Sequence, residues 1–411
     1  MTSATLANWR PFHRLRKIYL TLAPAEMSAA GLFQLHMRVS ALSLLVTFFI
    51  SPPLWIGTRD LFRISPILKI AEHVPESVND FLFISTVIVL SFLILFPRYH
   101  RFALYPPLAC FLWALQDELR FQPFVYMYCF VMLVLGLSSG PGKDTRLFDP
   151  IRFMTAGIYF WAGYYKINLP FIQGMFPWFV GNWFPPSMFT SALATITPFL
   201  EAAIGIFLLI PLSRTLGILF ASTMLAVVLL SLGPTGHNYA PIVWPWNVYI
   251  DVLAATLFWH HKEPLLDKKT LMRIPNIIAI LLFWFWPVFG IAGPTFMGSD
   301  PAFKLYCACT PNVFVQFDPA ENLSFLPPSL SDKVHHGRLD AISITYELLG
   351  VAAETAQPGL KLYTTGLKGF CPHLEKPDST RLIISMFDAP WTTKLTTYSM
   401  PLCTAPPESA K

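Results

Sequence analysis

Long apolar stretches dominate the chain up to about residue 294. They are separated by short polar or proline-containing loops and lie near 38–58, 79–97, 101–118, 122–138, 150–167, 191–211, 214–232, 243–260 and 273–294. Each has about the 20 residues that a helix needs to cross roughly 30 Å of hydrocarbon, whereas the strands of a membrane barrel alternate over about 10 residues. A backbone in lipid must also satisfy its own hydrogen bonds. The pattern predicts an α-helical polytopic membrane protein with about nine transmembrane helices over 38–294.

The pattern changes after Pro294. The short segments V-F-V-Q-F, I-S-I-T-Y, R-L-I-I-S-M-F and T-T-K-L-T-T-Y are rich in β-branched residues and are separated by Pro, Gly and Asp. Such segments are typical of strands. We therefore expect a small β-rich domain over 295–411.

Residues 1–37 include R-P-F-H-R-L-R-K-I-Y-L, in which basic and apolar residues are interleaved. A segment of this kind suits an amphipathic helix on the anionic inner leaflet. Its apolar run begins too late for a cleavable signal peptide.

Composition supports a membrane protein whose main partner is the lipid bilayer. Hydrophobic residues make up 54% of the chain and charged residues 13%, whereas soluble proteins carry about 25% charged residues. The net charge of +5 does not indicate nucleic acid, because the basic residues gather in particular loops. A cytoplasmic N-terminus would leave only Arg59, Arg63, Lys69 and Arg120 in the outer loops between spans. The positive-inside rule thus predicts an extracytoplasmic C-terminal domain, at the plasma membrane if the protein is bacterial.

The cysteines agree with this orientation. Cys307, Cys309, Cys371 and Cys403 follow the last span, on the side where disulfides persist. Cys307 and Cys309 are too close to pair easily with each other, so each is expected to reach towards Cys371 or Cys403. The alternative is four free thiols. Cys110 and Cys129 lie inside spans and are interpreted as small core residues.

Polar residues inside the spans are the first candidates for function, because ionisable groups there are costly. Lys166, Glu201 and Asp251 fall in the fifth, sixth and eighth spans, and His237 lies in an uncharged outer loop. All four are expected at or outside the bilayer midplane, on the same side of the membrane, and one outward-facing polar cavity would explain this. We expect these four residues to transfer protons. Residues expected to contact a substrate are Trp161, Tyr164, Tyr165, Arg120, Asn238, Trp244 and Trp246.

Less specific interpretations remain for these residues. The Lys166 ammonium could reach the headgroups while its stem lies in lipid. Glu201 could pair with Arg120 or Lys166 only to hold helices together. The uncharged aromatic segment 171–189 could roof a cavity or form an interfacial belt.

Other chemistry has little support. The chain has no G-x-S-x-G, P-loop, G-x-G-x-x-G after a strand or H-E-x-x-H motif. No second His or Cys stands at ligand spacing from His237, so no metal site is predicted. His260 and His261 are best explained by interfacial solvation, although haem ligation with His100 or His36 stays open.

The segment Y-F-W-A-G-Y-Y-K-I-N, the span P-F-L-E-A-A-I-G-I-F-L-L-I-P-L-S-R-T-L-G and the loop G-H-N-Y-A-P-I-V-W-P-W-N occur in this order. Over about residues 100–260 the chain resembles DoxX-like and MauE-like proteins and the horizontally transferred transmembrane domain related to gamma-glutamyl carboxylase. This resemblance implies a helical bundle, an outer-facing site and chemistry tied to quinones or thiol redox, with Lys166 as a base towards a reduced quinone. The chain is much shorter than the carboxylases, which puts carboxylation in doubt.

Two functions from different classes follow. The first is a membrane redox or proton-transfer protein acting on a quinone-like or other apolar substrate; a quinone is the candidate cofactor. The second is a non-enzymatic subunit or assembly factor whose C-terminal domain binds a partner in a membrane complex. Transport has less support, because no inverted repeat is visible.

Overall fold

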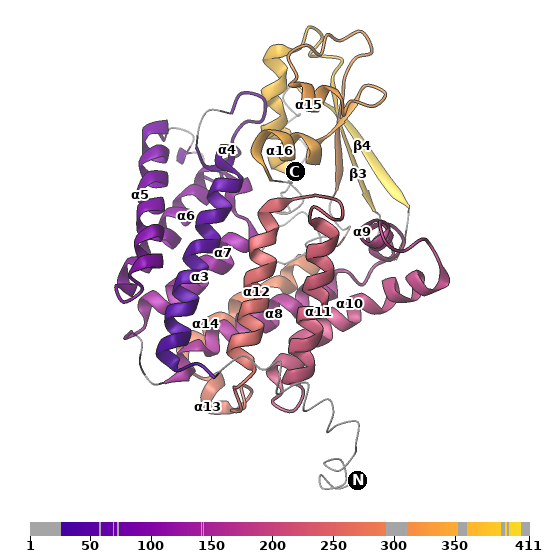
Figure 1. Cartoon of the computed structure of the whole chain (residues 1–411). Helices are drawn as coiled ribbons and strands as arrows, with labels where there is room; N and C mark the ends of the chain where they lie inside the picture. The colour runs from indigo at the N-terminus through magenta and orange to yellow at the C-terminus, as the bar shows by residue number, and fades with distance from the viewer. Residues whose placement is uncertain are drawn as a thin grey trace.

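The structure is a computed structural model that describes residues 26–403, except 57–58, 69, 72–73, 141, 143, 293–306, 308–310, 352–359, 388–390 and 393. A helical bundle forms one end of the molecule, and a small sheet with short helices forms the other (Figure 1). The expectation of a helical membrane protein followed by a β-containing domain is therefore confirmed at this level.

Within the described residues, five helices are long and apolar enough to cross a membrane. They are α3 (Ala29–Ile50), α5 (Glu76–Leu95), α10 (Met188–Leu209), α11 (Arg214–Leu232) and the continuous pair η6 (Pro241–Val243) and α12 (Trp244–Phe258). On α5, Phe81, Ile84, Ile88 and Leu95 are all exposed, as expected of side chains that face lipid.

Shorter helices occupy the other predicted spans. These are α6 (Tyr105–Gln116), α7 (Pro123–Leu137), α8 (Asp149–Tyr165) and α14 (Ile274–Ile280). Helix α14 continues as the short helices η7 (Leu281–Phe285) and η8 (Trp286–Ala292). The prediction of nine spans is thus confirmed only for the five long helices. The first of these begins at Ala29 rather than near 38, because the Ser28 side chain caps it by accepting from the amide of Gly31. Residues 1–25 of the predicted amphipathic segment lie outside the described residues.

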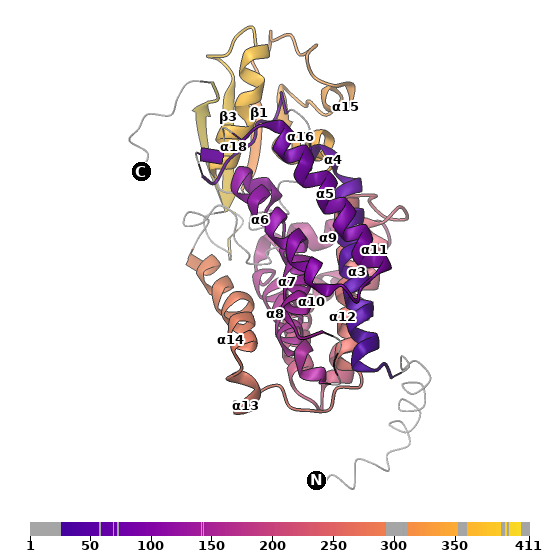
Figure 2. The same cartoon turned by 90° about the vertical axis from the view of Figure 1, so that its left-hand side faces the viewer.

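Helix α8 lies in the middle of the bundle and packs most extensively against α10 (Figures 1 and 2). The two backbones approach closely at glycines. A Cβ on Gly163 would lie 2.2 Å from the amide nitrogen of Ala202, and one on Gly205 would lie 2.4 Å from the carbonyl oxygen of Ala156. Small residues at a membrane helix interface permit this approach, so dispersion contacts between the helices replace contacts with lipid.

The aromatic segment 171–189 contains two short helical pieces, η5 (Phe171–Met175) and α9 (Phe176–Val180). Trp178, Trp183 and Phe184 remain more than a third exposed. This exposure favours the interfacial belt; the roof over a cavity stays a prediction.

The C-terminal sheet is antiparallel with the strand order β2-β1-β3-β4. The strands are β1 (Asn312–Gln316), β2 (Arg338–Asp340), β3 (Arg381–Phe387) and β4 (Leu395–Pro401). Val313, Val315, Leu382 and Ile384 are buried from alternate positions, which the period of a strand dictates. The predicted strand I-S-I-T-Y is wrong. It lies in helix α16 (Ala341–Leu349), which buries Ala341, Ile344 and Thr345 at helical spacing. Asp340 caps this helix, because its side chain accepts from the amide of Ser343.

The sheet region rests on loops at one end of the bundle. The amide of Arg63 donates to the carbonyl of Gly366 at 2.9 Å, and the Lys361 ammonium donates to the carbonyl of Pro66 at 2.7 Å. The rings of Tyr239 and Tyr346 stack 5.5 Å apart. The loops after α3 and α11 therefore meet the same domain, while α13 (Lys268–Leu271) lies at the opposite end (Figure 1).

One disulfide joins Cys371 to Cys403, with the Cα atoms 5.6 Å apart. The expected pairing of these residues with Cys307 and Cys309 is wrong. Strand β3 pairs with β4 and places the end of β4 beside the turn η9 (Leu367–His373), a proximity that sequence distance does not reveal. Cys309 lies outside the described residues. Cys110 and Cys129 are buried, as expected of core residues.

Peptide mapping without reduction is expected to recover one linked pair that contains Cys371 and Cys403. The bond closes a loop with a sequence separation of 32 residues. Closure of such a loop stabilises the folded state by about 3–4 kcal/mol in the chain-entropy model, so Cys403→Ser should make the full-length protein more sensitive to proteolysis within 307–403. A linked peptide containing Cys307 would contradict this pairing.

Candidate functional site

A buried ion pair between α8 and α10 joins the two residues that the sequence singled out first. The Lys166 ammonium lies 2.7 Å from both carboxylate oxygens of Glu201. Their side chains are 14% and 7% exposed. Of the partners considered for Glu201, the structure selects Lys166.

Local structure explains the position of this pair. Lys166 is the residue at the C-terminal cap of α8, where a cation interacts favourably with the helix dipole. Glu201 lies on α10, three residues after Pro198. The carbonyl oxygen of Pro198 would be only 2.6 Å from a Cβ on Gly163 of α8. The close approach at Gly163 brings the two charged side chains within contact, because Gly163 and Lys166 lie one turn apart.

A second carboxylate, that of Asp251, lies on α12, which packs against α8. Ser222 on α11 donates to the Asp251 carboxylate on α12 at 2.6 Å. Tyr159, two turns before Lys166 on α8, interacts electrostatically with both Asp251 and Glu201. Its hydroxyl is buried and has no hydrogen-bond partner among the described residues. Ser222 and Asp251 thus form a second polar contact, between α11 and α12.

Trp161, Tyr164 and Tyr165, which were expected to contact a substrate, pack against one another just before Lys166. The ring of Trp161 lies 5.3 Å from that of Tyr164 and 5.7 Å from that of Tyr165. The Tyr165 hydroxyl donates to the carbonyl of Pro287, and Tyr164 is 39% exposed. The two hydrogen bonds of the Lys166 ammonium go to Glu201.

The loop residues have other contacts. His237 stacks on Trp178 with ring centroids 4.2 Å apart, and its Nε2 lies 2.7 Å from the carbonyl oxygen of Trp178. Asn238 adopts a left-handed conformation with φ of 47°, which asparagine tolerates in turns. The indole of Trp244 donates to the carbonyl of Tyr239, and that of Trp246 to the sulfur of Met127. These contacts account for the loop without a substrate.

Arg120 belongs to a separate charged cluster at the end of the bundle that carries the sheet. Its guanidinium donates to the carbonyl of Leu54 at 2.8 Å and to the side chain of Gln116 at 3.1 Å. Asp117, in the same cluster, pairs with Arg59 at 2.6 Å. The alternative of a Glu201–Arg120 pair is therefore wrong.

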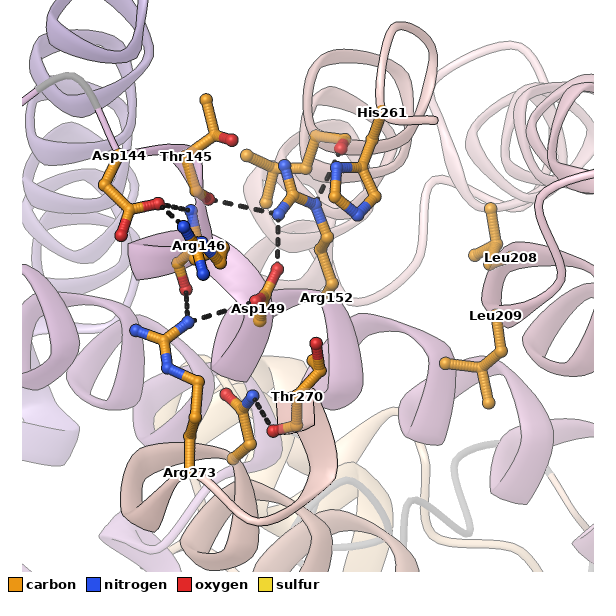
Figure 3. A network of polar contacts seen from close by, with 12 residues as sticks. Asp144, Thr145, Arg146, Asp149, Arg152, Leu208, Leu209, His261, Thr270 and Arg273 are labelled. Carbon is orange, nitrogen blue, oxygen red and sulfur yellow. Dashed lines mark hydrogen bonds and ion pairs between the residues drawn. The ribbon is translucent and has the colours of Figure 1, made fainter. Parts of the chain in front are cut away.

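The opposite end carries a buried network that sequence reasoning had treated as solvated (Figure 3). Arg152 on α8 is 2% exposed and donates to the Asp149 carboxylate at 2.7 Å and to the carbonyl of Leu257 at 2.8 Å. Arg273 also contacts Asp149, at 3.3 Å. Arg214 donates to the carbonyl of His261 at 2.7 Å. Burial, with the charges of Arg152 and Arg214, lowers the pKa of the His261 side chain to about 3.

The described bundle contains an apolar cavity and a polar cavity. An apolar cavity of about 350 Å³ lies between α6, α7 and η7, and its lining includes Cys110, Ala114, Arg120, Cys129 and Trp286. A polar cavity of about 290 Å³ opens at the other end of the bundle beside Arg152, Thr256, His261, Lys262 and Glu263. Neither lining includes Lys166 or Glu201.

Sequence reasoning missed Tyr159, Ser222 and the Asp149–Arg152 pair. The seven-residue spacing from Tyr159 to Lys166 was an available signal, because it places both on one helix face. Among the described residues, no three His, Cys, Asp or Glu side chains gather so that they could hold a metal ion. Comparisons of the chain with protein-family models, curated proteins and solved structures found no match.

Proposed function

We propose that the protein is an intramembrane proton-transfer protein that acts on the reduced, hydroxyl-bearing form of a quinone-like or other apolar compound. The observation that carries this proposal is the buried Lys166–Glu201 pair, with both oxygen distances at 2.7 Å. Ionisable residues within a membrane-embedded bundle are costly, and they mark proton relays and substrate sites.

The proton step needs no oxidant. When a hydroxyl of the substrate lies against the pair, its O–H bond breaks and the proton goes to the Glu201 carboxylate. The oxyanion that forms is stabilised by the Lys166 ammonium, which keeps its own proton. Asp251 and Tyr159 provide further groups that can carry the proton from Glu201, since Tyr159 interacts electrostatically with both carboxylates.

The apolar cavity supports a substrate of this class. Its lining is almost wholly apolar, and it includes Trp286, the residue before Pro287. Pro287 accepts the hydrogen bond of Tyr165, which directly precedes Lys166. An isoprenoid or acyl tail in the cavity would therefore contact Trp286, next to the residue that accepts the hydrogen bond of Tyr165. We propose that its ring or headgroup reaches the ion pair from there.

The proposal includes an orientation and a number of spans. We propose nine spans with the N-terminus in the cytoplasm and the sheet domain outside, where the Cys371–Cys403 bond would persist. The similarity to the DoxX-like and carboxylase-related group is part of this proposal and rests on the motif around Lys166.

A non-enzymatic subunit is the second candidate. Lys166 and Glu201 satisfy each other, and neither lines the two cavities, as expected of a pair that only fastens α8 to α10. In that case the sheet domain would bind a partner protein.

Binding of decylubiquinone distinguishes the two. We expect purified full-length protein in nanodiscs to bind it saturably, measured by quenching of tryptophan fluorescence, because Trp286 lines the apolar cavity. Ala114→Trp fills this cavity and should weaken binding by roughly tenfold or more, since it removes the space for the tail. Ile88→Trp is the matched control, because Ile88 is 62% exposed on α5, away from this cavity.

Equal quenching in wild type, Ala114→Trp and Ile88→Trp would reflect partition into lipid and would contradict a quinone site. Binding that is lost in Ala114→Trp but kept in Ile88→Trp supports the proposal.

A further inference from the structure

The polar cavity of about 290 Å³ lies at the ends of two helices that are long enough to cross a membrane. Its lining includes Met27 and Leu32, at and just before the start of α3, and Thr256 and Leu257 in the last turn of α12. The end of a membrane-crossing helix lies in the headgroup region of a bilayer. Because part of this lining is apolar, the cavity suits an amphipathic ligand at that level.

Arg152 places a buried cation in the wall of this cavity. Its side chain is 2% exposed. Nε donates to the carbonyl of Leu257, and Nη1 donates to the carbonyl of Thr145 and to the carboxylate of Asp149. A guanidinium has more donors than these bonds use. Within the described part of the chain Nη2 makes no hydrogen bond, so it remains available to a ligand.

The charges around Arg152 favour an anion (Figure 3). Two guanidinium groups share the Asp149 carboxylate, that of Arg152 at 2.7 Å and that of Arg273 at 3.3 Å. Arg214 donates to backbone carbonyls, which solvate its charge but do not neutralise it. Burial and the charges of Arg152 and Arg214 keep the pKa of the His261 side chain at about 3, so its ring is neutral. A phosphate would offset this excess of positive charge.

The rim of the cavity carries both signs of charge. Lys262, Glu26 and Glu263 line the cavity and are all exposed. Glu263 also interacts electrostatically with Arg152. The two rim carboxylates repel a ligand that is only negative, whereas they attract a ligand that carries a cation beside its phosphate.

We propose that this cavity binds the headgroup of a zwitterionic phospholipid, such as phosphatidylethanolamine. The phosphodiester accepts charge-assisted hydrogen bonds from Arg152 and Lys262. The ammonium of the headgroup lies towards Glu26 and Glu263, and the glycerol with the start of the acyl chains contacts the apolar part of the lining. The site is separate from the Lys166–Glu201 pair and does not depend on the proposed proton transfer.

Solvation by water is the competing explanation. Water can satisfy Nη2 of Arg152 and the exposed charges of the rim without a ligand. It gains nothing from the apolar part of the lining, which water wets at a cost in free energy. The two explanations differ in whether the purified protein retains a particular lipid.

Native mass spectrometry of the full-length protein in detergent tests the proposal. The protein is incubated with equal amounts of phosphatidylethanolamine and phosphatidylglycerol that have the same acyl chains. We expect phosphatidylethanolamine to be retained over phosphatidylglycerol by about fivefold or more, because only its headgroup carries a cation for the rim carboxylates. Lys262→Glu should reduce its retention by roughly tenfold, since a donor to the phosphate becomes a repelling carboxylate.

Lys269→Glu is the matched control. Lys269 is exposed on α13, at the same end of the bundle, and does not line the cavity. It makes the same change of charge and should leave retention unaltered. Glu263→Gln should bring the retention of the two lipids close to equality, because it removes a partner of the ammonium. All three positions are exposed, so we expect the variants to keep the unfolding temperature of the wild type.

Three outcomes would contradict the proposed headgroup site. Equal retention of the two lipids by the wild type would exclude selection of a zwitterion. Equal losses in Lys262→Glu and Lys269→Glu would show that lipid responds to the surface charge of this end and not to the cavity. Displacement of bound phosphatidylethanolamine by millimolar inorganic phosphate would assign the cavity to free phosphate instead of a lipid.

Discussion

Lys166→Met is expected to lower the free energy of unfolding by about 3–5 kcal/mol, which is among the largest effects of a single change in this chain. The Glu201 carboxylate is only 7% exposed and has both oxygens 2.7 Å from the Lys166 ammonium. Without the ammonium, a buried carboxylate would have no compensating charge. Glu201→Leu should be similarly harmful, since it leaves the ammonium without its partner.

The double variant Lys166→Met/Glu201→Leu is expected to recover most of this loss, because a buried pair can be exchanged for apolar residues at little cost. Lys166→Arg should also fold, since guanidinium pairs well with carboxylate. Under the proposed function, the double variant remains inactive in proton exchange with a bound quinol despite its recovered stability. A subunit role predicts that the double variant restores both abundance and phenotype.

Denaturant or thermal unfolding of the purified full-length variants, with membrane abundance, measures these effects. A loss below about 1 kcal/mol in both single variants would contradict a buried, coupled pair, because that is the size of an exposed one.

The second large effect concerns the α8–α10 interface. Gly163→Val is expected to destabilise the protein by about 3 kcal/mol or more and to reduce its membrane abundance. A Cβ at this position would be 2.2 Å from the amide nitrogen of Ala202 and 2.6 Å from the carbonyl of Pro198. These are backbone atoms, so the clash separates the helices, and with them Lys166 from Glu201.

Gly174→Ala is the matched control, because a Cβ on Gly174 would have nothing within 4 Å. It should be neutral or slightly stabilising, since alanine in a helical turn loses less conformational entropy than glycine. Abundance and unfolding temperature are compared for both variants. Equal behaviour of Gly163→Val and Gly174→Ala would show that the helices do not pack through Gly163.

Part of the site could be predicted because charge inside an apolar run is visible without a structure. Lys166 and Glu201 stood out in this way, and their pairing was one of two stated alternatives. Arg120 was the other, and it failed because α6 and α7 place it beside Leu54 and Asp117. Cys371 and Cys403 are separated by 32 positions, and only the pairing of β3 with β4 brings them together.

The sequence by itself determined the membrane class, the helical segments and the sheet region, because hydropathy and residue period act over a few residues and are read along the chain. It wrongly predicted a strand at I-S-I-T-Y, since the Ile, Thr and Tyr residues of this segment suit a strand until the Asp340 cap is considered. Only the tertiary structure decided which helix faces touch. Lys166, for example, has its partner only because α10 brings Glu201 beside it. Such contacts depend on close helix packing at residues like Gly163. This packing requires both chain segments, so neither segment predicts it alone.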